Sequence, residues 1–329
     1  MNIWLFLGVL LIASLILTWI IRSVAIKRNI IDVPNERSLH FVPTPRGGGL
    51  AIVALWFGAL ILLHFNNKIP NNLFFALFSG LLLAVISFLD DIFSLRPVFR
   101  LIAQIGSSSL ALFFLKGFDT TYFFDAKIFD ILIIPFIITG MIWYINLYNF
   151  LDGIDGYASL EAIFVAFSMY IFTGELLTLV LIAPVAGFLF WNWPKAKIFM
   201  GDVGSTQLGF ILIVLGVYFH NSDGLDFLVW IILTSSFWFD ATLTLLRRWK
   251  NGEKLSHAHK KHAYQRIVQY GFSHQRVLFI LIFVNAIIFL ITIVYREFDF
   301  LKIPLILITL AGLYFLYKMV DKRVPFDSL

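Results

Sequence analysis

Long apolar runs separated by short polar segments make up most of this chain. The runs cover residues 4–21, 50–64, 72–89, 98–115, 128–147, 157–173, 176–193, 206–219, 226–246, 277–295 and 302–317. A helix of about 20 apolar residues, rising about 1.5 Å per residue, spans a hydrocarbon core about 30 Å thick. The pattern therefore predicts an all-α, polytopic integral membrane protein with about 11 transmembrane helices. Because the runs follow one another without a linker, we expect a single domain over residues 1–329.

The composition agrees with a membrane protein and excludes an ordinary soluble globule. Of the 329 residues, 60% are hydrophobic and 14% are charged, whereas soluble proteins carry about 25% charged residues. The chain has no Cys, which excludes disulfides and thiolate metal sites. The net charge of +5 does not by itself indicate nucleic-acid binding, so its placement along the chain decides its meaning.

The basic residues are segregated between the two sides of the predicted bundle. Of the 25 Lys and Arg residues, 20 fall on the side that holds the loops near 22–46, 96–100, 195–197, 247–276 and 318–323. The other side holds Lys68, Lys116, Lys127, Arg296 and Lys302. Loops rich in Lys and Arg stay in the cytoplasm. We therefore predict that the N-terminus lies outside, and that the C-terminus and the active site are cytoplasmic.

The stretch N-L-Y-N-F-L-D-G-I-D-G at 146–156 directly follows an apolar run and is unusually polar for such a position. Asn146 and Asn149 are three residues apart, as are Asp152 and Asp155, so on a helical turn each pair shares a face. Carboxylate and amide oxygens on one face form a hard-oxygen site of the kind that Mg²⁺ accepts. A helix-capping turn between two spans is the alternative interpretation.

The segment 32–49 reads D-V-P-N-E-R-S-L-H-F-V-P-T-P-R-G-G-G. Arg37, His40 and Arg46 are donors suited to phosphate. The three glycines at 47–49 expose backbone N–H groups just before a helix, which predicts an anion cradle. A rigid surface loop is the alternative.

Two other cytoplasmic helix ends carry acids. Asp90 and Asp91 are adjacent and point to different faces of a helix, so one can face a metal while the other orients a basic partner. Asp202 stands between two glycines ahead of an apolar helix, which fits both a helix N-cap and a ligand site. A solvated helix end and an N-cap are the respective alternatives.

The segment 255–267 reads L-S-H-A-H-K-K-H-A-Y-Q-R-I. Its three His lie among basic residues, which disfavours zinc ligation because cations oppose a metal dication. A basic loop facing anionic lipid heads is one interpretation, and an anion-binding loop over a diphosphate is the other.

All these acids and bases fall at cytoplasmic ends of the predicted spans. Acids for a metal and bases for phosphates on one membrane surface indicate phosphoryl transfer, which depends mostly on positioning and charge stabilisation.

Five stretches in this order resemble the polyprenyl-phosphate N-acetylhexosamine-1-phosphate transferase superfamily, the MraY- and WecA-like enzymes. They are P-T-P-R-G-G-G at 43–49, D-D-I-F-S-L at 90–95, the 146–156 stretch, F-M-G-D-V-G-S at 199–205 and the His segment at 257–262. The resemblance implies transfer of a sugar 1-phosphate from a UDP-sugar to undecaprenyl phosphate, with release of UMP. It implies Mg²⁺ as cofactor, with Mn²⁺ as a substitute, and a bacterial inner membrane.

The resemblance also implies roles for particular residues. The catalytic acids are Asp90, Asp91, Asp152, Asp155 and Asp202. The metal contacts are Asn149 and Asp202. The substrate-binding residues are Arg46, Asn146, Asn149, His257, His259, Lys260 and His262, with the His segment expected to grip the donor diphosphate and its sugar.

The His segment departs from the MraY and WecA patterns and is similar to the WbpL-like branch that starts O-antigen chains. We therefore expect a role in O-antigen, lipopolysaccharide or other surface-polysaccharide synthesis, and a donor other than the muramyl pentapeptide. The partners expected are the UDP-sugar, undecaprenyl phosphate and the lipid bilayer, with no nucleic acid. A homodimer is left open.

Two other classes and one other mechanism compete with this interpretation. A polytopic transporter would carry ionisable residues inside its spans, where the sequence places only Glu161 and Asp240. A CDP-alcohol phosphotransferase would use a compact run of Asp on adjoining helices, whereas these acids are spread over four loops. Because the acceptor phosphate is mostly ionised at pH 7, Asp90 is expected to position it first and act as a base second. A covalent aspartyl-phosphate route stays open.

Overall fold

The computed structural model describes residues 2–34, 39–93, 95–120, 131–255, 257 and 259–326. Arg37 and Lys127 lie outside the described residues. The helices are α1 (Ile3–Lys27), α2 (Gly49–Phe65), α3 (Asn71–Phe78), α4 (Gly80–Phe93), α5 (Pro97–Leu115), α7 (Ile134–Phe150), α8 (Tyr157–Thr173), α9 (Leu176–Asn192), α10 (Asp202–Asn221), α11 (Phe227–Leu233), α12 (Ser235–Lys250), α13 (Ala263–Gln269), α14 (His274–Glu297), η1 (Asp299–Leu301) and α15 (Lys302–Arg323). Two short strands, β1 (Ile31–Asp32) and β2 (Thr44–Pro45), pair antiparallel with Ile31 opposite Pro45.

The prediction of a helical membrane protein is confirmed, whereas the number of crossings is not. Each of the 11 apolar runs overlaps a helix or a pair of helices. Among the described residues, 6 helical segments are long and apolar enough to cross a membrane, and the pair α11–α12, bent by 72°, would make a seventh. The helices α2, α7, α8 and α9 have 17 residues each, which is about 26 Å and shorter than a typical hydrocarbon core.

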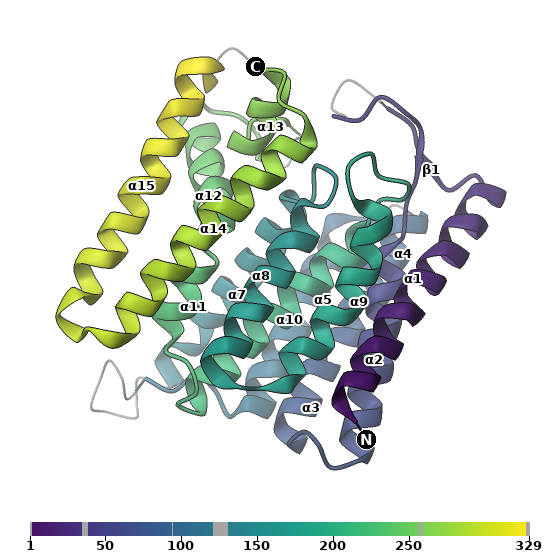
Figure 1. The fold of residues 1–329 in the computed structure, drawn as a ribbon, viewed down its shortest axis with the longest axis vertical. Helices are drawn as coiled ribbons and strands as arrows, with labels where there is room; N and C mark the ends of the chain where they lie inside the picture. The colour runs from purple at the N-terminus through teal and green to yellow at the C-terminus, as the bar shows by residue number, and fades with distance from the viewer. Residues whose placement is uncertain are drawn as a thin grey trace.

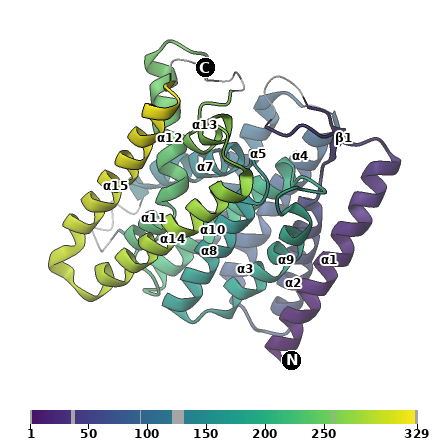
Figure 2. The same ribbon diagram turned by 45° about the horizontal axis from the view of Figure 1, so that its top comes forward.

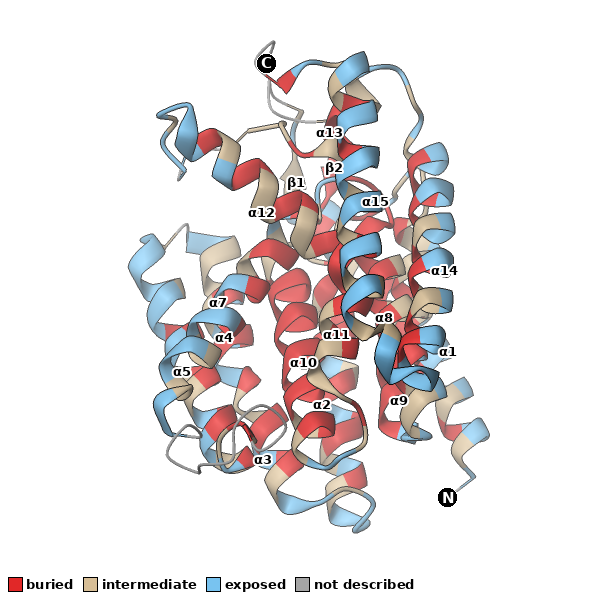
Figure 3. Cartoon of the chain, turned by 90° about the vertical axis from the view of Figure 1, so that its left-hand side faces the viewer, coloured by how far each residue is buried: buried red, intermediate tan, exposed pale blue. Residues whose placement is uncertain are grey.

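Helix α10 forms the centre of the bundle (Figure 3). Its most apolar 18-residue window is 94% buried, whereas the corresponding windows of α1 and α15 are 22% and 17% buried. Close packing around α10 needs glycine at particular places. A Cβ added at Gly209 would lie 2.9 Å from Cβ of Tyr148, and one at Gly216 would lie 2.7 Å from Cδ1 of Trp230. Since side-chain crowding at these contacts would push α7 and α11 away, the glycines let helices approach closely.

The polar loops gather at one end of the bundle. Figure 1 shows β1 and α13 at the end where α15 finishes, while α1 starts at the opposite end. Figure 2, with this end turned toward the viewer, shows α13 on one side of it and β1 on the other. We call it the polar end, and it comprises β1, β2, α13 and the loops 28–48, 151–156, 193–201 and 251–262.

The charge segregation expected from the sequence has a counterpart in the fold. The described basic residues of the sparse side, which lie at or beside the ends of α2, α5, α14 and α15, are Lys68, Lys116, Arg296 and Lys302. These helix ends lie away from the polar end. The polar end therefore carries most of the positive charge of the chain.

Candidate active site

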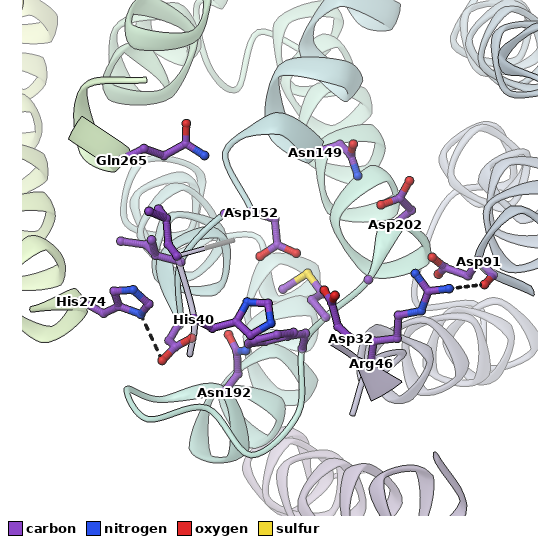
Figure 4. A pocket seen from close by; sticks show the side chains of 17 residues that line it. Asp32, His40, Arg46, Asp91, Asn149, Asp152, Asn192, Asp202, Gln265 and His274 are labelled. Carbon is purple, nitrogen blue, oxygen red and sulfur yellow. Dashed lines mark hydrogen bonds and ion pairs between the residues drawn. The ribbon is translucent and has the colours of Figure 1, made fainter. Parts of the chain in front are cut away.

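A polar cavity of about 430 Å³ opens between the loops of the polar end. We call it the first cavity. Its charged and amide-bearing lining residues are Asp32, His40, Arg46, Asp91, Asn149, Asp152, Asp155, Asn192, Asp202, Gln265 and His274. Figure 4 shows that these side chains come from separate segments of the chain and point toward a shared space. Sequence motifs far apart in the chain thus meet at one place.

The stretch 146–156 provides the floor of this cavity, although it is not one helical face as expected. Helix α7 ends at Phe150, and residues 151–156 form an irregular loop. Asp152 and Asp155 therefore lie on this loop rather than on a helical turn. A Cβ added at Gly153 would strike the hydroxyl of Tyr264, so the loop can pass under α13 only with glycine there.

Asn149 and Asp202 face each other across one side of the first cavity (Figure 4). Asn149, in the last turn of α7, donates its Nδ2–H to Oγ of Ser205 at 2.9 Å. Asp202 is the first residue of α10, and its neighbour Gly201 occupies the N-cap position without a side-chain capping bond. Asp202 is therefore not a helix cap, and its carboxylate is available to other partners.

Asp152 lies between the other carboxylates of the cavity. Burial, together with the nearby charges of Asp202, Asp155 and Asp91, raises the pKa of Asp152 well above its usual range. Mutually repelling carboxylates in one cavity are stabilised when a cation binds among them. The arrangement thus favours a cation on the side of Asp202.

Asp90 and Asp91 point in different directions at the end of α4. Asp91 lines the first cavity, and its backbone carbonyl accepts a hydrogen bond from Nη2 of Arg46 at 2.7 Å. Asp90 pairs instead with Arg100, whose Nη1 is 3.2 Å from Oδ2 of Asp90 and 3.4 Å from Oδ2 of Asp202. Arg100 thus links Asp90 to Asp202 and, through it, to the cavity.

At the other side of the cavity, Asp155 has two close contacts. Nδ1 of His274 lies 3.1 Å from Oδ2 of Asp155, and the backbone N–H of Ala196 donates to the same oxygen at 3.1 Å. Figure 4 shows His274, the partner of Asp155, apart from Asp202 and Arg46, with Asp152 between them. The first cavity therefore has two ends of different chemistry.

A second cavity, of about 650 Å³, adjoins the first. The two share Asn149 and Gln265. The polar lining residues of the second cavity are Arg100, Gln104, Asn146, Asn149, His257, His259, His262 and Gln265, and its apolar ones are Pro97, Val98, Leu101, Phe150, Leu245 and Leu255. Several of these apolar side chains are exposed on the outside of the helices, among them Val98 and Leu101. The second cavity thus combines a polar inner wall with an apolar margin.

Asn146 contributes to the wall of the second cavity in a fixed orientation. Its Nδ2 donates to Oε1 of Gln104 at 2.9 Å, and Nε2 of Gln104 donates back to Oδ1 of Asn146 at 3.1 Å. Both amides are thereby held rigid. Asn146 and Asn149 therefore differ in role, because only Asn149 lines both cavities.

The three His of the 254–266 loop line the second cavity rather than the first. They therefore lie apart from the carboxylates of the first cavity. Burial and the nearby positive charges of Arg248 and Lys261 lower the pKa of His259 to about 3, and burial beside Arg248 lowers that of His262 to about 3. Both rings are neutral at pH 7.

The positive charge of this loop is also smaller than expected. Arg248 and Lys261 each contact Glu253 at 2.9 Å. Lys260, which we expected to bind substrate, is half-buried and is absent from the lining of either cavity as described. Glu253 therefore offsets part of the positive charge of this loop, which also offers the ring nitrogens of its His residues.

The glycines at 47–49 do not form the predicted anion cradle. The N–H of Gly48 donates to the carbonyl of Phe199 at 2.9 Å, and the N–H of Gly49 donates to that of Met200 at 2.8 Å. A Cβ at Gly48 would meet the ring of Phe188. Gly48 and Gly49 thus allow close packing against the 199–204 segment, and their N–H groups are already used.

Sequence reasoning missed several polar residues of the cavities, among them Arg100, Gln104, Gln265 and His274. The first two are interruptions of the apolar run at 98–115, a signal that was present. Gln265 and His274 follow the His segment among other polar residues, so only the fold distinguishes them.

The donor set is compatible with Mg²⁺ but not with a cage made by the protein alone. Among the described residues, no three His, Asp or Glu side chains converge closely enough to hold a metal ion. Mg²⁺ is commonly held by one or two protein oxygens together with substrate phosphates and water. Asp202 and Asn149 match that need. For Asn149 to bind the ion, its side-chain amide rotates so that the oxygen, rather than the nitrogen, faces Asp202.

Comparison with known proteins identifies relatives of this chain. Residues 73–220 match the model of the family described as Glycosyl transferase family 4. The chain is 29% identical over 303 residues to the probable undecaprenyl-phosphate N-acetylglucosaminyl 1-phosphate transferase of Bacillus subtilis, covering 87% of this chain and 83% of that protein. It is 26% identical over 300 residues to the decaprenyl-phosphate N-acetylglucosaminephosphotransferase of Mycobacterium tuberculosis, covering 79% of this chain and 74% of that protein.

A third relative is the phospho-N-acetylmuramoyl-pentapeptide-transferase of Streptococcus pneumoniae, 30% identical over 208 residues, which cover 58% of this chain and 63% of that protein. The family match includes the helix ends that carry Asp91, Asn149 and Asp202. The predicted resemblance to the superfamily of polyprenyl-phosphate N-acetylhexosamine-1-phosphate transferases is thereby confirmed.

Proposed function

We propose that this protein transfers an N-acetylhexosamine 1-phosphate from a UDP-sugar to undecaprenyl phosphate, with release of UMP. The observation that carries the proposal is the meeting of two unlike cavities at Asn149 and Gln265. One is polar and rich in carboxylates, and the other has an apolar margin. A water-soluble donor and a lipid acceptor need such a pair, because their phosphates must meet while their remaining parts stay in different surroundings.

The first cavity suits the UDP-sugar. Its Asn149 and Asp202 would hold Mg²⁺ or Mn²⁺ on the donor diphosphate, and the bound ion would neutralise charge that develops during transfer. Arg46 lies at the same end of the cavity and provides a further positive charge. Asp155, at the other end, is left to contact the uncharged nucleoside, since a carboxylate beside a diphosphate would repel it.

The second cavity suits the lipid phosphate. Arg100 lines it and carries a guanidinium that matches phosphate geometry. The neutral rings of His259 and His262 offer hydrogen bonds at its inner wall. The apolar side chains at its margin would contact the first isoprene units.

The chain then acts chiefly by positioning. The acceptor phosphate is mostly ionised at neutral pH and needs little help from a base. Asp90 is paired with Arg100, so it orients the residue that binds the acceptor rather than contacting the acceptor itself. Asn149 and Gln265, at the boundary, contact the phosphoryl group as it passes from one cavity to the other.

The location and pathway form the finer part of the proposal. We infer that the polar end faces the cytoplasm of a bacterium, because it holds most of the Lys and Arg residues and because UDP-sugars are cytoplasmic. Two relatives named above act with N-acetylglucosamine, which makes this sugar our first choice of donor. A WbpL-like role in O-antigen synthesis is a second, narrower hypothesis that rests on the His segment.

A transporter is less well supported. The two acids near span interiors are both held by hydrogen bonds. Glu161 accepts from Oγ of Ser236 at 3.0 Å and from Nδ2 of Asn285 at 2.7 Å. Asp240 accepts from the N–H of Ala263 at 2.9 Å. These contacts join helices and do not line the two cavities described above.

The test is transfer by the purified protein with undecaprenyl phosphate and a panel of labelled UDP-sugars. We expect a radiolabelled lipid product and stoichiometric UMP with one UDP-N-acetylhexosamine, and no product when the divalent cation is chelated. Full turnover in excess EDTA would remove the metal from the proposal. Absence of product with every UDP-sugar, from protein that remains folded, would refute the transfer itself.

A further inference from the structure

His274 is the one described ring that forms an ion pair with an acid of the first cavity. It is the first residue of α14, and its Nδ1 lies 3.1 Å from Oδ2 of Asp155. Both side chains are largely buried, with exposures of 16% and 10%. A buried His–carboxylate contact fixes the orientation of both groups. Neither the sequence motifs nor the names of the relatives give His274 a role.

The two carboxylate oxygens of Asp155 differ in their contacts. Oδ2 accepts from the backbone N–H of Ala196 at 3.1 Å and contacts His274 at 3.1 Å. Among the hydrogen bonds between described residues, Oδ1 has none. Because Oδ2 is held from two directions, the plane of the carboxylate is fixed and Oδ1 is left for a ligand in the cavity that Asp155 lines.

The position of Asp155 and His274 in the cavity determines which part of the UDP-sugar they can contact. His274 lies on the side of the first cavity away from Asp202 and Arg46 (Figure 4), and Asp155 lies there with it because the two are in contact. The proposed diphosphate occupies the Asp202 side, so the nucleobase of the same molecule reaches the Asp155 side. A carboxylate oxygen accepts the N3–H of uracil, whereas cytosine presents an unprotonated N3 that the carboxylate repels.

We propose that His274 is the positioning residue for nucleobase selection: it holds Asp155 so that one carboxylate oxygen faces the base and accepts the uracil N–H. This inference rests on the proposed use of the first cavity for a UDP-sugar. His274 acts through Asp155 and does not touch the reacting phosphate. Its loss therefore weakens the binding of donor and transition state alike, which raises the KM for the UDP-sugar and leaves kcat close to that of the wild type.

The experiment compares His274→Leu with His274→Asn. The Asn side chain places its amide nitrogen two bonds from Cβ, as Nδ1 is in His, and so retains the donor to Asp155. Leu has similar bulk and no donor. The matched control is His64→Leu, because His64 stacks on Phe74 with ring centres 3.9 Å apart at the end of α2 and lines neither cavity as described.

The readouts are the dissociation constants of UMP and CMP, measured by calorimetry on the detergent-purified protein, together with KM and kcat. We expect His274→Leu to weaken UMP binding by about ten-fold, the loss of one well-oriented charge-assisted hydrogen bond, and to change CMP binding little. His274→Asn should restore most of the preference for UMP, and His64→Leu should keep all of it. In an Asp155→Asn background, His274→Leu should add little further loss, since the two residues act as one unit.

Several results would overturn the inference. One is an unchanged ratio of UMP to CMP affinity in His274→Leu. Another is an equal loss of affinity for both nucleotides in His274→Leu and His274→Asn together with a lowered melting temperature, which would indicate a structural role only. If His274→Leu does not fold, His274→Ser is measured in its place, because Ser is tolerated in a first helical turn and cannot reach Asp155. A wild-type chain that binds UMP and transfers sugar phosphate while the variants keep their selectivity refutes this inference alone. A wild-type chain that binds no uridine nucleotide refutes both this inference and the proposed function.

Discussion

The substitution Arg100→Met should change substrate binding strongly while changing the stability of the fold little, so it is the clearest test of the second cavity. Arg100 links Asp90 to Asp202 through contacts of 3.2 and 3.4 Å, and its side chain is 39% exposed. Exposed ion pairs of this kind contribute about 0–1 kcal/mol to folding. Met keeps most of the aliphatic stem and removes the guanidinium. We therefore expect the unfolding free energy of Arg100→Met to fall by about 1 kcal/mol or less.

The effect on the acceptor should be much larger. A charge-assisted hydrogen bond to phosphate is worth about 1.5–3 kcal/mol, which corresponds to roughly a ten- to hundred-fold change in affinity. The assay varies undecaprenyl phosphate at saturating UDP-sugar, and then varies UDP-sugar at saturating lipid. The KM for the lipid should rise by this factor, and the KM for the UDP-sugar should change little. The lipid KM of Arg100→Lys should lie between those of the wild type and Arg100→Met, because Lys keeps the positive charge but lacks the planar guanidinium.

The matched control is Arg96→Met. Arg96 is an exposed residue that precedes α5 and lines neither cavity as described. The Arg96→Met variant tests whether loss of any positive charge beside α5 has the same effect on the lipid KM. A lipid KM within about two-fold of wild type in Arg100→Met, or the same rise in Arg96→Met, would refute the assignment of the second cavity to the acceptor phosphate.

Three further predictions follow from the described contacts. Asp202→Ala and Asn149→Ala should each abolish turnover and leave the melting temperature near that of the wild type, as measured by product formation and thermal unfolding; near-normal rates in either would remove it from the metal site. In this Cys-free chain, Ser222→Cys should react with a membrane-impermeant thiol reagent in intact cells and Lys254→Cys should not, because Lys254 belongs to the polar end; the reverse pattern would invert the topology. Since the pKa of His262 is lowered to about 3 from an unfolded value of about 6.5, unfolded chains bind more protons, and stability should fall by about 1.4 kcal/mol per pH unit as the pH drops from about 6.5 toward 3. His262→Gln should flatten this pH dependence of the melting temperature, and an unchanged slope would show that the ring is not buried in its neutral form.

Helical runs and acidic helix ends could be read from the sequence because each depends on local pattern. The runs of apolar residues locate α1, α5, α10 and α14 closely. The acids at 90–91, 152, 155 and 202 were found because carboxylates beside apolar runs are rare. That these acids meet in one cavity could be expected only because the sequence predicts all of them on the same side of the membrane.

Other features depend on contacts that no local pattern specifies. The glycines at 47–49 looked like an anion cradle, yet the N–H groups of Gly48 and Gly49 pair with the 199–200 segment about 150 residues away. The His segment looked strongly basic, but Glu253 offsets part of the charge of Arg248 and Lys261. His274 could not be distinguished from other polar residues until the fold brought it to Asp155.

The burial of α10 has a consequence for how the enzyme responds to its membrane. The apolar windows of α1 and α15 are 22% and 17% buried, whereas that of α10 is 94% buried, so in a bilayer we expect lipid to contact α1 and α15 rather than α10. When a bilayer becomes thicker or thinner, the helices in contact with lipid adjust their tilt. Asp202 stands on the first turn of α10, so a change in the tilt of the outer helices is transmitted to it only through the helices between them. The geometry around Asp202 is thus mechanically insulated, and reconstitution in lipids of different chain length should change the tilt of the outer helices well before it changes the affinity for the proposed metal ion.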